Sequence, residues 1–150
     1  MLPELRECAA VPGSLIGQVL HRGRALDLRV VDDGEPLSQV LGFAEKAVAA
    51  LSELEAKAKL VAVRDLLTTY NEDWRHYGIV GENGSSIEVH DPELTSDQFQ
   101  ARLRLNGITV TGSTCLDLCF SDDRMFAGHS VFVTSTDGLQ CANADATLFG

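Results

Sequence analysis

A long amphipathic stretch between Leu37 and Tyr70 constrains the fold more than any other feature of the sequence. Apolar residues recur there every three or four positions and charged residues occupy the other side, which is the pattern of a helix with one buried face. A continuous helix of this length would measure about 50 Å, whereas a compact domain of this size is only ~40 Å across. The sequence therefore predicts a helix over about 37–70 that bends or breaks near Glu55–Lys59, or else has a protruding end.

Short segments of β-type sequence flank the predicted helix. Before it, residues 14–20 and 25–31 are rich in β-forming residues and are joined by a short polar turn, the pattern of a hairpin with one buried face. After it, strand-like runs are separated by Gly, Ser, Asp and Asn residues. These runs are Ile108–Val110, Thr114–Phe120, Met125–Thr134 and Ala144–Phe149.

A second helix and a loop complete the predicted elements. Thr95 and Gln98 match the capping box, in which the two side chains bind free amides of the first turn, and predict a helix over about 96–105. The Gly and Ser residues of 71–94 predict a long loop with a short strand at Ser86–His90. The sequence thus predicts one α+β domain over residues 1–150, with an irregular segment at 1–13. A single antiparallel sheet of about five or six strands would be packed on one face by the helices.

Acidic residues dominate the second half of the chain. The net charge is −10, and residues 66–150 carry twelve acids against four bases. Such a surface repels nucleic-acid backbones and attracts basic partners, so we expect no nucleic-acid binding. The longest apolar runs fall far short of the ~20 residues of a membrane span, and the first residues show no targeting pattern, so we expect a cytoplasmic protein without membrane contact. The alternative interpretation of the acidity is solubility alone.

The sequence contains no complete catalytic or metal-binding motif. Its cysteines and histidines show none of the spacings that hold zinc, and its acids form no calcium loop. Glycine-rich phosphate loops and the serine nucleophile elbow are also missing. We therefore expect no metal, no cofactor, four free thiols and a role other than catalysis.

Two segments allow both a functional and a structural interpretation. His129 with Asp122 or Asp123 would form an acid/base pair, or else the two aspartates make a hairpin turn and His129 bonds into the sheet. Trp74, at the end of the long helix, is either a binding hot spot or a core anchor. The residue types favour the structural account in both cases and leave the other open.

The same residues carry a resemblance to a bacterial family, catalogued as domain of unknown function 2262. The resembling motifs are Leu66-Leu67-Thr68-Thr69-Tyr70-Asn71-x-x-Trp74, Thr95-x-x-x-Phe99-x-x-Arg102-Leu103, Phe120-x-Asp122-x-x-x-Phe126-x-Gly128-His129-Ser130 and the closing Gly150. The similarity extends over about residues 14–150, and Ala127 stands where a bulky aromatic residue is expected. The resemblance implies one common fold and no particular activity.

By looser analogy, the chain resembles the small acidic immunity proteins that neutralise toxins of contact-dependent growth inhibition. An acidic inhibitor fits a basic toxin surface, such as that of a nuclease, and associates faster through electrostatic steering. We therefore predict a protein-binding module, specifically an immunity protein for a cognate toxin, with an oligomeric state left open. The alternatives are a small enzyme or ligand-binding domain that uses His129 with Asp122, and a regulatory or scaffold domain. The predicted contact residues are Glu72, Asp73, Trp74, Glu82, Glu88, Asp91, Glu93, Asp122 and Asp123.

Overall fold

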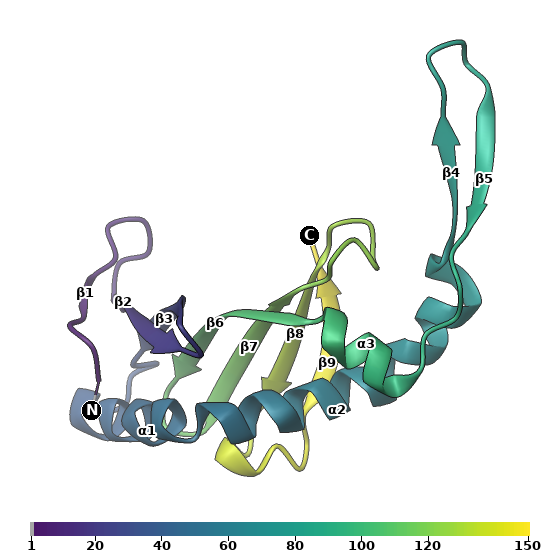
Figure 1. Ribbon diagram of the computed structural model, residues 1–150. Coiled ribbons are helices and arrows are strands. Elements are labelled where there is room, and N and C mark those ends of the chain that lie inside the picture. Colours follow the sequence, from purple (N-terminus) through teal and green to yellow (C-terminus); the bar gives the residue numbers. More distant parts are fainter. Residues whose placement is uncertain (1) are drawn as a thin grey trace.

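A computed structural model describes residues 2–150 as a curved seven-stranded sheet with two long helices along one face, α1 (Leu37–Ala49) and α2 (Leu51–Thr69) (Figure 1). The strand order is β1-β2-β3-β6-β7-β8-β9. The strands are β1 (Arg6–Glu7), β2 (Ser14–His21), β3 (Arg24–Val31), β6 (Arg104–Thr111), β7 (Cys115–Ser121), β8 (Ser130–Ser135) and β9 (Asp145–Phe149). The remaining elements are the π-helical turn η1 (Tyr70–Trp74), β4 (His76–Val80), β5 (Ser86–His90), α3 (Ser96–Arg102) and the 3-10 turn η2 (Gly138–Gln140).

The predicted α+β class is confirmed, but the prediction of an all-antiparallel sheet of five or six strands is wrong. The sheet is mixed, because β3 and β6 pair in parallel at its centre while every other neighbouring pair is antiparallel. The first residues of β6 were not predicted as strand. A register irregularity between Leu105 and Gly107 interrupts the alternation of buried and exposed residues there. The N-terminal segment also contributes a two-residue edge strand, β1, where an irregular segment was expected.

The predicted long helix breaks at Ala50, not at Glu55–Lys59. Ala50 has φ −99° and ψ 17°, outside the helical region, while its amide still bonds to the carbonyls of Lys46 and Ala47 at 3.0 and 3.2 Å. Small buried residues line the inner faces of both helices and let the two segments follow the curved sheet. Those residues are Ala44 and Ala47 in α1, and Ala58 and Ala62 in α2.

The capping box of α3 is present as predicted. The Thr95 hydroxyl accepts from the Gln98 amide at 3.2 Å, and the Gln98 side chain accepts from the Thr95 amide at 2.9 Å. The helix ends at Arg102 rather than 105, because Leu103 is extended and buried at the start of the connection to β6. Phe99 is fully buried beneath the helix.

We expect Thr95→Ala to lower the free energy of unfolding by about 1 kcal/mol, because the amide of the first turn loses its acceptor. Thr68→Ala, an exposed position inside α2, is the matched control and should cost nothing measurable, since alanine favours helix. Urea unfolding of both variants measures the difference. Equal stabilities of the two variants would contradict the assigned cap.

Residues 71–94 form a protruding hairpin instead of the predicted long loop. The expected strand at Ser86–His90 is present as β5, and His76–Val80 adds a second strand, β4, that pairs with it. This two-stranded ribbon belongs to a separate sheet and projects well beyond the rest of the fold (Figure 1). We refer to residues 76–90 as the arm.

Candidate protein-binding surface

A network of hydrogen bonds fixes the base of the arm to the end of α2. The side-chain amide of Asn71 donates to the Leu94 carbonyl at 3.0 Å and its oxygen accepts from the Leu94 amide at 2.9 Å. The Arg75 guanidinium donates to the carbonyls of Asn71 and Asp91, at 2.7 and 3.0 Å. These bonds join both ends of the arm to one turn, so the arm leaves the body in a defined direction.

An aromatic cluster beneath this base anchors it to the core. Tyr70, Phe99 and Phe126 are almost completely buried and meet at tilted or edge-on angles, with ring centroids 5.8–6.4 Å apart. Trp74 stacks edge-on against Phe126 at 5.6 Å and against the His129 ring at 5.7 Å. Trp74 is partly buried against the core, so the core-anchor interpretation describes most of its contacts and a rim of the ring stays accessible.

The two faces of the arm differ in chemistry. Directly opposed pairs place Tyr77, Val89, Ile79 and Ile87 on one face, with the side chains of Tyr77, Ile79 and Ile87 46–61% exposed. An isolated two-stranded hairpin in water is only marginally stable, and an exposed apolar strip of this kind is typical of an interaction surface. We call these four residues the apolar strip.

The other face of the arm carries a histidine pair and, toward the tip, Val80, which is 76% exposed. His76 and His90 lie directly opposite each other, and their Nδ1 atoms are 2.6 Å apart, within hydrogen-bonding distance. The Glu88 carboxylate lies 3.7 Å from Nε2 of His90. Within residues 2–150 no group of three or more His, Cys, Asp or Glu side chains is arranged to hold a metal ion, and two imidazoles supply only half of a tetrahedral shell.

Most of the predicted contact residues gather on the arm or at its base. Glu72 and Asp73 lie in η1, Glu82 at the tip, Glu88 in β5, and Asp91 and Glu93 directly after it. Among these six acids only Glu93 approaches a guanidinium, that of Arg75 at 3.8 Å. Residues 72–93 thus present six acids against one arginine, and the arginine is directed inward.

The two remaining predicted acids are engaged elsewhere. Asp123 is exposed and bonds to the Arg102 guanidinium at 3.0 Å. Asp122 is 5% exposed, and its carboxylate accepts from the amides of Arg124, Phe126 and Gly128 at 2.8–3.0 Å. Asp122 therefore organises a turn, and little of its side chain reaches the surface.

The Asp122 turn also corrects the predicted strand Met125–Thr134, which begins only at Ser130. Asp123, Arg124, Ala127 and Gly128 adopt positive φ angles, and Met125 and Phe126 turn inward to the core. In this turn His129 Nδ1 lies 2.6 Å from the Phe126 carbonyl, to which it donates. Asp122 and His129 thus bond separately to the backbone, and the geometry supports the structural account of both residues.

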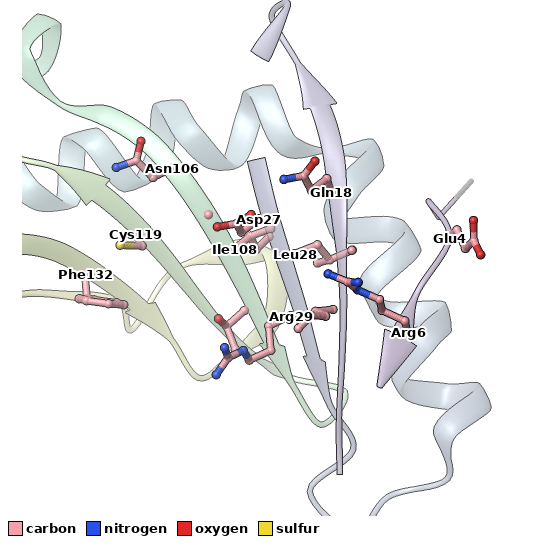
Figure 2. Close-up of a pocket in the computed structure, with 14 residues that line it drawn as sticks. Glu4, Arg6, Gln18, Asp27, Leu28, Arg29, Asn106, Ile108, Cys119 and Phe132 are labelled. Atoms are coloured by element: carbon pink, nitrogen blue, oxygen red, sulfur yellow. The ribbon is translucent and has the colours of Figure 1, made fainter. Parts of the chain in front are cut away.

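A groove on the sheet face opposite α1 and α2 was not anticipated from the sequence. It has a volume of about 970 Å³ and runs across β1, β2, β3, β6, β7 and β8 (Figure 2). Strand register explains it, because residues on this face line up in rows that no local pattern reveals. One row is Arg6, Ile16, Arg29 and Thr109, and the next is Gln18, Asp27, Gly107, Cys119 and Phe132. We refer to this feature as the groove.

Comparison with known proteins gives one match. The family model DUF2262, described as an uncharacterized protein conserved in bacteria, matches residues 17–145. The chain belongs to this family. No curated protein and no solved structure matches it. The match confirms the resemblance seen in the sequence motifs. The matched segment includes the whole arm, the Asp122 turn and all but the N-terminal wall of the groove.

Among the helices within residues 2–150 of this DUF2262 protein, none combines the length and apolar character needed to cross a membrane. All four cysteines are free: Cys8, Cys115, Cys119 and Cys141. Burial raises the pKa of the thiols of Cys115, Cys119 and Cys141, which makes these three poor nucleophiles.

Proposed function

We propose that this DUF2262 protein is a cytoplasmic protein-binding module, and specifically an immunity protein that binds and neutralises a cognate basic toxin domain. The observation that carries the proposal is the arm, an exposed apolar strip on a ribbon surrounded by six acids and fixed at its base. Neither catalysis nor a bound cofactor explains why a small domain would expose such a strip.

The two properties of the arm contribute differently to binding. Burial of the apolar strip supplies affinity, at about 1.5–3 kcal/mol for each fully buried aliphatic side chain. The acids act at longer range, since opposite charges steer encounter and accelerate association at low salt. A nuclease toxin fits this chemistry, because an active site that holds phosphates presents clustered Lys and Arg.

The geometry also suits occlusion of an active site. A two-stranded ribbon is narrow and reaches away from the body (Figure 1), so it can enter a concave site that a flat surface cannot cover. Asn71 and Arg75 hold the base in place, which reduces the entropy lost on binding. Two further predicted contacts lie outside the strip: Trp74 in η1, and Asp123 in the turn after β7, beside Arg102.

The double variant Ile79→Ser/Ile87→Ser tests this proposal. We expect it to weaken binding to the toxin domain encoded beside the gene by at least about 100-fold, because two anchors of ~1.5 kcal/mol or more are lost. Leu60→Ser, at a 59% exposed position on α2, is the matched control and should bind like the wild type. Calorimetric titration at low and high salt measures both affinities.

Since the substituted side chains are exposed, circular dichroism should show an unchanged fold in both variants. Wild-type protein that shows no salt-sensitive binding to the neighbouring toxin domain would exclude the immunity role. Binding that is intact in the double variant would exclude the arm as its site.

A further inference from the structure

The groove provides a second exposed surface, which combines apolar area with two guanidinium groups and two carboxylates. Its floor is hollow because Gly107 sits in a row with Asp27 and Cys119, where any other residue would point a side chain into the space. A Cβ at Gly107 would lie 3.2 Å from the Asp27 carbonyl oxygen, so the backbone is tightly packed at this point. The groove is therefore a built feature of the sheet and not a gap left by a flexible loop.

Two guanidinium groups face this groove. Arg6 and Arg29 stand on either side of Ile16 in one cross-strand row, and Figure 2 shows both side chains lying over the sheet. Most of the other bases in the described chain form ion pairs, whereas neither of these does. Glu4 and Asp27 also line the groove, so its formal charge is balanced while that of the whole chain is −10.

The groove also offers apolar area. Ile16, Cys119 and Phe132 are partly exposed there, and the Phe132 ring meets the Phe149 ring edge-on at 5.4 Å. One face of a sheet left partly apolar, without a covering layer, is a surface that favours association.

We infer that the groove receives the arm of a second copy of this chain, so that two copies exchange arms in a closed, two-fold symmetric dimer. The apolar strip of one copy packs on Ile16, Cys119 and Phe132 of the other. The acidic tip of the arm, with Glu82, then approaches Arg6 and Arg29. Each copy supplies one arm and one groove. In the dimer both arms and both grooves are covered, so no further copy can add to the assembly.

Charge decides between this arrangement and the simpler one, in which two arms pack strip to strip. Direct packing of two arms would bring the acids at both tips and both bases together, and like charges in contact oppose association. Placing the arm in the groove brings those acids to a surface where two guanidiniums, Arg6 and Arg29, balance the carboxylates of Glu4 and Asp27, so the repulsion is weaker there. This inference goes beyond the proposed function, because it makes the arm a shared element for which a toxin domain and a second copy compete.

Sedimentation velocity over a range of protein concentrations tests the dimer. We expect a concentration-dependent monomer–dimer equilibrium for the wild type, and at least a tenfold higher dissociation constant for Arg6→Glu/Arg29→Glu and for Ile79→Ser/Ile87→Ser. Lys46→Glu, an exposed base on α1, reverses a charge away from the groove and should dimerise like the wild type. The inference is overturned if the wild type stays monomeric at every concentration. It is also overturned if Arg6→Glu/Arg29→Glu leaves the dissociation constant of the dimer unchanged.

Cross-linking then distinguishes the two arrangements. In an Ile87→Cys variant, a short thiol-specific cross-linker should join the introduced thiol to Cys119 of a second copy, because both lie on the proposed contact. The reaction is run at alkaline pH, which offsets the raised pKa of the Cys119 thiol. A Leu60→Cys variant provides the background. Mass spectrometry that instead finds two introduced thiols joined to each other would identify strip-to-strip packing and rule out exchange into the groove.

Discussion

Asp122→Ala is expected to lower the free energy of unfolding by about 3 kcal/mol, because three backbone amides lose one shared, charged acceptor. The amide of Phe126 is buried, and those of Arg124 and Gly128 are partly so, which limits how far water can replace the carboxylate. The turn holds several residues at positive φ, and without the carboxylate that conformation loses its main local support. Chemical denaturation of the wild type and the variant measures the loss.

The neighbouring Asp123→Asn is the natural control for this prediction. Asp123 is exposed and its ion pair with Arg102 lies at the surface, and asparagine tolerates the positive φ of this position, so the variant should unfold close to the wild type. Similar stabilities for the two variants would show that the Asp122 carboxylate does not organise the turn.

Glu55→Ala should cost about 3 kcal/mol of unfolding free energy, since it breaks a buried charge network. Glu55 is 7% exposed and bonds to His21 Nε2 at 2.6 Å and Lys59 Nζ at 3.2 Å, with Arg22 at 3.8 Å. His21 is itself only 9% exposed and would be left without its carboxylate partner. The control is Glu53→Ala, two residues earlier on the opposite side of the same helix, whose pair with Lys57 is exposed and contributes little.

The loss in Glu55→Ala should depend on pH. Burial acts to raise the pKa of the Glu55 carboxyl, but hydrogen bonds from His21 and Lys59 outweigh it and hold the pKa below its ordinary value. A carboxyl with a lowered pKa in the folded state stabilises the fold at pH values above its unfolded pKa, and this contribution disappears as the pH falls through the folded pKa. The stability difference from the wild type should therefore be full near neutral pH and shrink in the acidic range. A difference that is independent of pH would contradict the charge network.

Local patterns predicted the parts of the fold whose physics is local. The alternation of Leu26, Leu28 and Val30 identified β3, and all three side chains are buried as that pattern requires. Thr95 and Gln98 identified α3 through bonds only three residues apart. Such features depend on neighbouring residues, so a single sequence contains the information.

The remaining features depend on contacts between distant segments. The helix breaks at Ala50, where the sequence has no glycine or proline, and the two segments pack on different strands: α1 on β3 and β6, and α2 on β8 and β9. The strand at His76–Val80 escaped prediction because glycines at 78 and 81 and the lack of a buried face mimic a loop. Rows such as Arg6, Ile16 and Arg29 exist only once the register is known, and so the groove has no signature in the sequence.

The six acids of the arm and its base were singled out as contact residues from the charge of the sequence, whereas the apolar strip beside them was not predicted. Acidic residues are visible as a charge excess in any part of the chain. Tyr77, Ile79 and Ile87 look like ordinary core residues in the sequence, and only the protruding ribbon shows that they are exposed. The sequence likewise did not show that Asp122 is buried. Its acidity suggested a place on the surface, whereas its side chain is 5% exposed.

The parallel pairing of β3 with β6 has a consequence for how the chain reaches its fold. Leu28 pairs with Ile108, eighty residues later, so the centre of the sheet cannot close until most of the protein has left the ribosome. Contacts between such distant segments slow folding, because the entropy of closing a long loop must be overcome first. Until then the N-terminal hairpin has an unpaired edge at β3 that can join foreign strands. A chain cut before Arg104 would therefore leave β3 without its parallel partner strand.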